Sequence, residues 1–125
     1  LCYAMNALNL PGVYFRSIVF KPFYGRDQGK TLRGVQIHLN DIDQVELLPL
    51  QFYFMQVHHE LYPEKDIFGL SENRWNMFDK VNGSDFVRSE FSSHYLVDSL
   101  LVNWREEAKA FQQESIPFWL YPANN

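Results

Sequence analysis

Three side chains that can both donate and accept hydrogen bonds recur at every second position in one short segment. They are Gln36, His38 and Asn40, and they alternate with the apolar residues Val35, Ile37 and Leu39. Because side chains alternate between the two faces of a strand, one face of this segment is apolar and the other is polar. Amides and an imidazole suit a neutral, hydroxyl-rich ligand. A half-exposed strand with a solvated polar face explains the same pattern without a ligand.

Other groupings of reactive residues point to no catalytic or metal site. His58 and His59 are adjacent, so on a helix they point about 100° apart, and no His lies four residues from another. The single Cys2 excludes an internal disulfide and a Cys-based zinc site. Since the chain also lacks a phosphate-binding glycine loop and a Gly-x-Ser-x-Gly elbow, we predict no metal and no cofactor, and the catalytic residues stay unassigned.

Composition is typical of one folded domain with a large apolar content. The 125 residues are 46% hydrophobic and 17% aromatic, with a net charge of −4. The eleven Lys and Arg residues are scattered along the sequence, which argues against a nucleic acid partner. No run is long enough to span a bilayer. The chain opens without Met, inside a helix-like pattern, so we expect a fragment of a longer protein.

The elements that must position the polar strand are predicted from periodicity and breakers. β-branched and aromatic residues indicate strands, and apolar spacings of three and four indicate helices. We predict a compact α+β domain with a small mixed sheet. Its strands lie near 13–20, 33–39 and 117–121, and it is covered by amphipathic helices near 49–62, 84–90 and 97–112.

Gly, Pro, Asn and Ser residues indicate where the segments between the strands and helices lie. Residues 24–31 form a polar loop with Gly25 and Gly29, and loops of this kind carry function more often than cores do. Residues 65–77 have no clear period and are expected to be irregular, anchored by Trp75. Residues 78–85 are expected to turn, with Ser84 as the cap of the next helix.

The order of several short motifs resembles one protein family. The chain is similar to the C-terminal domain of the bacterial exo-acting β-N-acetylmuramidases, long known only as a domain of unknown function. The similarity covers about residues 11–121. It rests on these residues: Phe20-x-Pro22, Gly34-Val35-Gln36-Ile37-His38 with Asp41, Pro49, Tyr62-Pro63, Phe78-Asp79-Lys80, Gly83-Ser84-Asp85, Val87-Arg88, Trp104, Phe111 and Leu120-Tyr121.

The resemblance implies a two-domain enzyme of which this chain is one part. Residues 1–10 are then the tail of an upstream helix or linker, and residues 11–125 are the C-terminal α+β domain. The partner is an N-terminal, Rossmann-like catalytic domain of the same chain, and the substrate is a peptidoglycan-derived sugar that begins with N-acetylmuramic acid. The resemblance also implies an extracytoplasmic location, and we expect the isolated fragment to be inactive.

The resemblance also implies that the polar face of the strand at 33–39 binds substrate. We expect Gln36 and His38 to face the cleft between the domains, where ligand sites commonly form. Arg16 and the loop residues Arg26 and Lys30 are further candidates, because a lactyl carboxylate suits an Arg fork. The alternative is a non-catalytic glycan-binding or packing module whose platforms are the aromatic residues Tyr24, Trp75 and Trp119.

Overall fold

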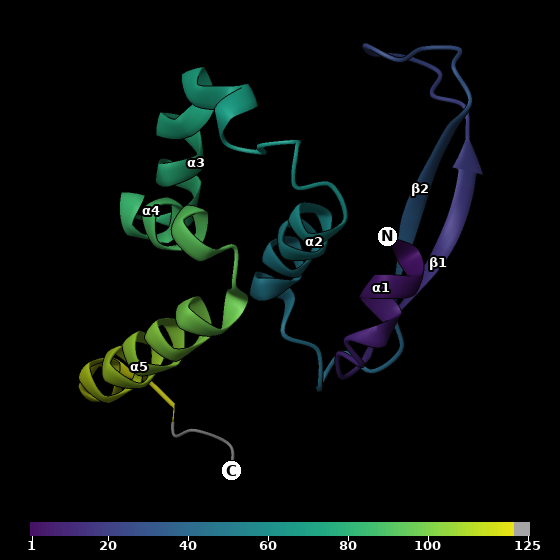
Figure 1. Ribbon diagram of the computed structural model, residues 1–125. Helices are drawn as coiled ribbons and strands as arrows, with labels where there is room; N and C mark the ends of the chain where they lie inside the picture. Colours follow the sequence, from purple (N-terminus) through teal and green to yellow (C-terminus); the bar gives the residue numbers. More distant parts are fainter. Residues whose placement is uncertain (122–125) are drawn as a thin grey trace. The chain divides into compact units, whose positions relative to one another are not determined.

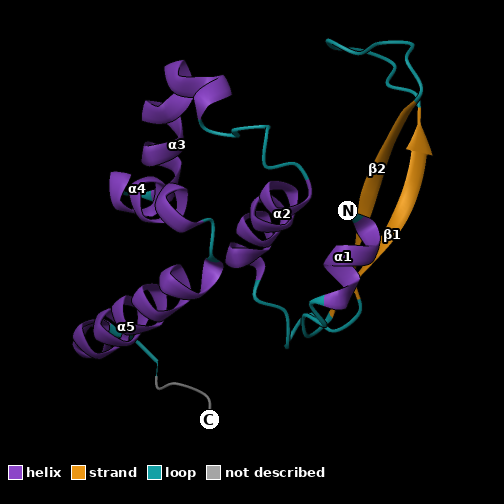
Figure 2. Ribbon diagram, in the orientation of Figure 1, coloured by secondary structure: helices purple, strands orange, loops and turns teal. Residues whose placement is uncertain are grey.

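The computed structural model describes residues 1–121, except for the side chains of residues 70–72. The chain divides into two compact units, Leu1–Ile67 and Phe68–Asn125. The first unit contains α1 (Cys2–Ala7), β1 (Val13–Phe20), β2 (Leu32–Leu39) and α2 (Leu47–Leu61). The second contains η1 (Gly69–Arg74), α3 (Trp75–Asn82), α4 (Asp85–His94), α5 (Val97–Ser115) and η2 (Ile116–Phe118) (Figures 1 and 2). The predicted α+β class is confirmed.

The two strands of the first unit form an antiparallel hairpin. Its register runs from Val13 opposite Leu39 to Phe20 opposite Leu32. Residues 21–31 form the loop that joins the strands at the end of the hairpin away from α1 (Figure 1). Both strands are rich in β-branched and aromatic residues, which fit a half-buried pleated surface. The sequence predicted both strands within one residue of their observed bounds.

The core of the first unit lies against one face of this hairpin. It contains Met5 of α1, Phe15 of β1, and Leu50 and Val57 of α2. The Phe15 ring meets the Phe54 ring edge to face, with centroids 5.4 Å apart. Burying each of these side chains stabilises the unit by about 1.5–3 kcal/mol. The hairpin therefore has one core face and one outward face.

The core of the second unit is built from aromatic rings. Phe68 packs against Phe78, Phe91 and Tyr95, with ring centroids 5.4 to 6.4 Å apart. The aliphatic residues Val87, Val97 and Leu100 are buried. Ser84 caps α4, since its Oγ accepts a hydrogen bond of 3.0 Å from the Phe86 N–H, as the sequence predicted.

The predicted strand at 117–121 is wrong, and the sheet is antiparallel with two strands rather than mixed in the part of the chain that the structure describes. Residues 116–118 instead form η2 directly after α5. Pro117 has no N–H to donate to a strand ladder, and its fixed φ suits the start of a helical turn. Trp119 turns back onto the helix end, because its indole N–H donates to the Ser115 hydroxyl at 3.1 Å.

Helix α3 corrects two predictions: residues 75–77 were expected to be irregular and residues 78–82 to belong to a turn, but all of them are helical. Its regularity comes from tertiary contacts that its sequence does not display, above all the ring contact between Phe78 and Phe68. The last predicted helix is correct but extends to Ser115. Its apolar face is buried only at the start, since Val97 and Leu100 are buried while Phe111 is 70% exposed.

Candidate functional site

The outward face of the hairpin brings together three of the five predicted binding residues. Arg16 lies directly opposite Gln36, and Tyr14 lies directly opposite His38. Side chains directly opposite each other in an antiparallel pair share a face, with Cβ atoms about 5 Å apart. Phe15, between Tyr14 and Arg16, points into the core. The four polar side chains therefore form one continuous patch, called here the hairpin patch.

Two backbone connections hold the base of the hairpin patch in place. The Asn6 side chain pairs with the backbone of Phe15, donating to its carbonyl at 2.7 Å and accepting from its N–H at 2.9 Å. The Gly12 carbonyl accepts hydrogen bonds from the Asn40 and Asp41 N–H groups at 2.8 and 3.2 Å. Residues before β1 and after β2 thus fix the register that sets Arg16 against Gln36.

His38 is half-buried, whereas Arg16, Gln36 and Tyr14 are exposed. The Nε2 atom of His38 is buried and has no hydrogen-bond partner within the described part of the chain. A buried polar nitrogen without a partner is uncommon in native proteins. Within the described residues, no hydrogen bond therefore gives this nitrogen a structural role.

Arg26 and Lys30 do not join the hairpin patch. They lie in the loop beyond the Phe20–Leu32 pair, and the strand between Arg16 and Phe20 alone spans about 13 Å. Lys30 forms an exposed ion pair with Asp27 at 2.9 Å. The loop is ordered by its own hydrogen bonds, including one of 3.0 Å from the Gly29 N–H to the Pro22 carbonyl.

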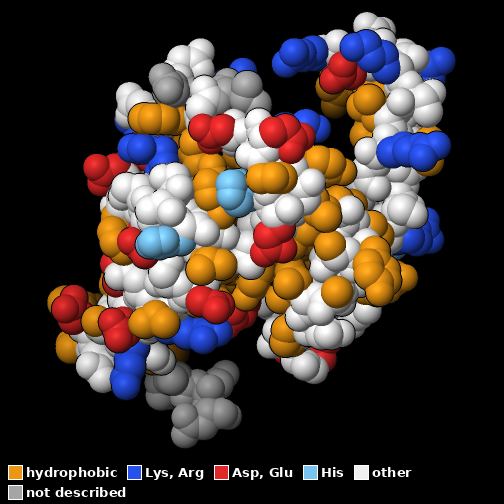
Figure 3. Space-filling view, viewed as in Figure 1, with side chains coloured by type: hydrophobic (Ala, Val, Ile, Leu, Met, Phe, Trp, Pro, Cys, Tyr) orange, Lys and Arg blue, Asp and Glu red, His pale blue; other side chains and the backbone are white. Residues whose placement is uncertain are grey.

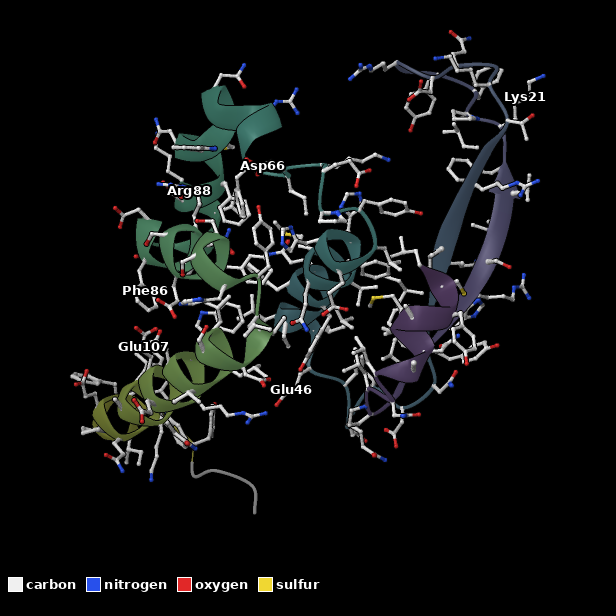
Figure 4. All side chains as sticks on the ribbon, in the orientation of Figure 1. Lys21, Glu46, Asp66, Phe86, Arg88 and Glu107 are labelled. Carbon is white, nitrogen blue, oxygen red and sulfur yellow. The ribbon has the colours of Figure 1, made fainter. Side chains whose placement is uncertain are left out.

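The hairpin and its loop carry most of the positive charge that could attract an anion. Residues 13–39 contain five Lys or Arg residues and one Asp, a net charge of +4, whereas the rest of the chain carries −8. Figure 3 shows these basic side chains along the hairpin and around its loop, where Figure 4 labels Lys21. Lys21 and Tyr14 were not among the site residues predicted from the sequence. Counting the charged residues in each predicted element would have identified Lys21.

The aromatic platforms of the alternative hypothesis differ in availability. Tyr24 is 83% exposed in the loop. Trp75 is engaged inside the second unit, because its indole N–H donates to the Phe68 carbonyl at 3.0 Å and the Arg88 guanidinium lies 4.6 Å from its ring centroid. Trp119 is 42% exposed beside the end of α5. Tyr24 is therefore the most accessible of the three.

The described residues offer neither a metal-binding cluster nor a membrane-spanning helix. In residues 1–121, apart from the three side chains that are not described, no three His, Cys, Asp or Glu side chains are grouped so that they could bind a metal ion. His58 instead contacts the Tyr62 ring, with centroids 5.2 Å apart. No described helix has the length and apolar character needed to cross a bilayer.

Comparison with known proteins gives consistent matches at the level of sequence and structure. The family profile described as "Exo-beta-N-acetylmuramidase NamZ, C-terminal" matches residues 1–121. The peptidoglycan beta-N-acetylmuramidase NamZ of Bacillus subtilis (strain 168) is 29% identical over 117 residues, which are 94% of this chain and 27% of that protein. A crystal structure of a DUF1343 family protein from Bacteroides fragilis NCTC 9343 superposes with a TM-score of 0.88 at 34% identity. That match covers 98% of this chain and 33% of the other.

Proposed function

Because this chain belongs to the family of NamZ C-terminal domains of exo-β-N-acetylmuramidases, we propose that it completes the substrate cleft of such an enzyme. The chain spans 27% and 33% of the lengths of the two relatives, and the catalytic domain belongs to the remainder of a longer protein. That protein removes N-acetylmuramic acid from the non-reducing end of peptidoglycan fragments. The chain by itself is inactive, because it supplies part of the cleft without the groups that cleave the bond.

The observation that carries this proposal is the outward pairing of Arg16 with Gln36 beside His38. N-acetylmuramic acid presents a lactyl carboxylate, an acetamido group and hydroxyl groups. An Arg guanidinium forms paired, charge-assisted hydrogen bonds with a carboxylate. Gln and His exchange hydrogen bonds with amide and hydroxyl groups. The three side chains on one face of the hairpin thus match the three kinds of polar group on the sugar.

The positive charge of the hairpin also favours binding of N-acetylmuramic acid, which is an anionic sugar. A net charge of +4 over residues 13–39 attracts a carboxylate-bearing saccharide, whereas the −8 on the rest of the chain repels it. The basic loop residues Arg26 and Lys30 contribute to this field without contacting the sugar held at Arg16. The field favours the approach of an anionic glycan end to the hairpin over other surfaces of the domain.

Two substitutions in the full-length protein test the proposal. Arg16→Gln removes the carboxylate fork, and we expect KM for a soluble fragment ending in N-acetylmuramic acid to rise about tenfold. His38→Ala should lower kcat/KM about three- to tenfold. Arg33→Gln is the matched control, because Arg33 lies opposite Val19 on the other face of the hairpin. Steady-state hydrolysis rates, with circular dichroism to verify folding, give the comparison.

A result in which Arg16→Gln and His38→Ala both keep the wild-type KM and kcat would refute a role in substrate binding. The second candidate, a glycan-binding or packing module, would then stand. It is favoured by Phe23 and Tyr24 in the loop, which are 88% and 83% exposed. Under that alternative, Tyr24→Ala weakens retention on insoluble peptidoglycan and leaves the kcat on soluble fragments unchanged.

The proposed substrate implies an extracytoplasmic protein, since peptidoglycan lies outside the cytoplasmic membrane. Cell fractionation with an antibody against this domain tests the location. Recovery of the full-length protein from the periplasm or the culture medium is expected. Recovery with the cytoplasmic fraction alone contradicts this location.

A further inference from the structure

The second unit contains a hollow that the hairpin does not contribute to. Its volume is about 430 Å³, and it is lined by the turn at residues 82–84 between α3 and α4, by Phe86 and Val87 of α4, and by Asn103, Trp104 and Glu107 of α5. Figure 4 shows the labelled Phe86 and Glu107 on the sides of α4 and α5 that face each other. The hollow therefore lies between neighbouring helices, a common position for a ligand pocket.

The walls of the hollow are fixed by local structure. Gly83 ends α3 in the left-handed conformation, with φ 80°, and its N–H donates to the Lys80 carbonyl. Ser84 then caps α4 through the Phe86 N–H, and Val87, which lines the hollow, is buried and 4% exposed. The hollow is thus preformed, so a ligand does not have to order these residues.

Polar groups at the rim of the hollow have unused hydrogen-bonding capacity. In the described structure, the side chains of Asn103 and Glu107 form no hydrogen bond and no ion pair, while Ser84 accepts one bond and retains its O–H donor. Asn103 and Glu107 are four residues apart on α5, so they lie on one face of the helix. The hollow therefore offers an amide, a carboxylate and a hydroxyl beside two aromatic rings, Phe86 and Trp104.

We propose that this hollow binds a neutral saccharide unit of the N-acetylhexosamine class. Aromatic rings stack on the apolar face of a sugar, while amide and carboxylate groups bond to its hydroxyl groups. The carboxylate of Glu107 disfavours a sugar that bears a carboxylate, because like charges repel. The hollow thus selects a neutral sugar, whereas the hairpin patch selects an acidic one. The choice of peptidoglycan glycan as the source of this sugar rests on the proposed function.

The test uses the full-length protein and the β-1,4-linked trimer of N-acetylglucosamine, which has no carboxylate. Isothermal titration calorimetry measures Kd for the wild type and for Asn103→Ala and Glu107→Gln. We expect each variant to raise Kd about fivefold or more, because Asn103→Ala removes a hydrogen-bonding group and Glu107→Gln replaces a charge-assisted hydrogen bond with a weaker neutral one. Glu106→Gln is the matched control, since it makes the same charge change at the adjacent residue outside the hollow.

The outcomes separate this proposal from the proposed function. Trimer binding that weakens in both hollow variants and not in Glu106→Gln supports the site even if the full-length protein hydrolyses no muramic acid substrate. The site is overturned if the trimer does not bind at about 10 mM, or if neither variant changes its Kd. If hydrolysis still depends on Arg16 in that case, the proposed function stands. If Asn103→Ala does not fold, the Glu107→Gln result decides.

Discussion

At the scale of single residues, Asp79 of α3 and Arg88 of α4 form a two-pronged ion pair in the second unit. The Arg88 guanidinium donates to both carboxylate oxygens of Asp79, with both N–O distances 2.8 Å. It also lies over the Trp75 ring. Such a fork fixes the orientation of two helices more firmly than a single ion pair does. Its role is to hold α3 against α4, which in turn shapes the turn at residues 82–84.

This pair makes the stability of the protein depend on pH. The hydrogen bonds from Arg88 hold the pKa of Asp79 below its ordinary value of 3.8. A carboxylate whose folded pKa is lowered stabilises the fold above its unfolded pKa and loses that contribution as pH falls through the folded value. We therefore expect Asp79→Asn to be less stable than wild type at pH 7. The difference should shrink as pH falls below 3.8.

Urea denaturation followed by Trp fluorescence measures this difference at each pH. Asp43→Asn is the control, because Asp43 is an exposed carboxylate in the other unit and should match wild type at pH 7. A stability gap between wild type and Asp79→Asn that stays constant from pH 7 to well below pH 3.8 would contradict the assigned cause of the pKa shift.

At the scale of elements, the hairpin depends on how α1 is joined to β1. Gly12 turns the chain there with φ 68°. A Cβ at this position would overlap the Asp41 carbonyl oxygen and lie 3.1 Å from the Val45 N–H nitrogen. The close approach allows the Gly12 carbonyl to bond to the end of β2. One small residue thus ties the start of β1 to the end of β2.

Two glycine substitutions distinguish the free-energy cost of a left-handed backbone from the cost of a steric overlap like the one at Gly12. Gly83 also has a positive φ, but a Cβ there meets nothing within 4 Å. Gly83→Ala should therefore cost only the left-handed conformation, about 1–2 kcal/mol. Gly12→Ala should cost about 2–5 kcal/mol, because the backbone must also move. Urea denaturation followed by circular dichroism gives both values, and equal losses would show that the overlap at Gly12 is relieved without cost.

At the scale of the whole molecule, charge is divided between the hairpin and everything else. The +4 of residues 13–39 and the −8 of the remaining residues sum to the net −4 of the chain. A small net charge can hide opposite local fields. The Lys and Arg residues look scattered in the linear sequence, and that impression understated the basic character of the hairpin. The field there favours anionic ligands at low salt, and salt screens it.

The charge division predicts different salt dependences for acidic and neutral sugars. Raising NaCl from about 0.02 to 0.5 M should raise the KM for an N-acetylmuramic acid fragment about three- to tenfold. Kd for the neutral trimer should change little. The triple substitution Lys21→Gln, Arg26→Gln and Lys30→Gln should flatten the first dependence. If the wild type and the triple variant respond equally to salt, the hairpin is not the source of the attraction.

The sequence by itself determined the features that depend on near neighbours in the chain. Alternation placed Gln36 and His38 on one strand face, periods of three and four located α2 and α5, and Ser84 marked the start of α4. These succeed because strand alternation, helix spacing and capping act over a few residues. The family resemblance rests on the same short motifs.

Only the tertiary structure decided which distant residues meet. It set Arg16 opposite Gln36, paired Asn6 with the backbone of Phe15, made α3 a helix and removed the expected strand at 117–121. Register and packing follow from contacts between residues far apart in sequence, and local propensity yields to them. The hairpin patch and the hollow between α4 and α5 are products of that packing.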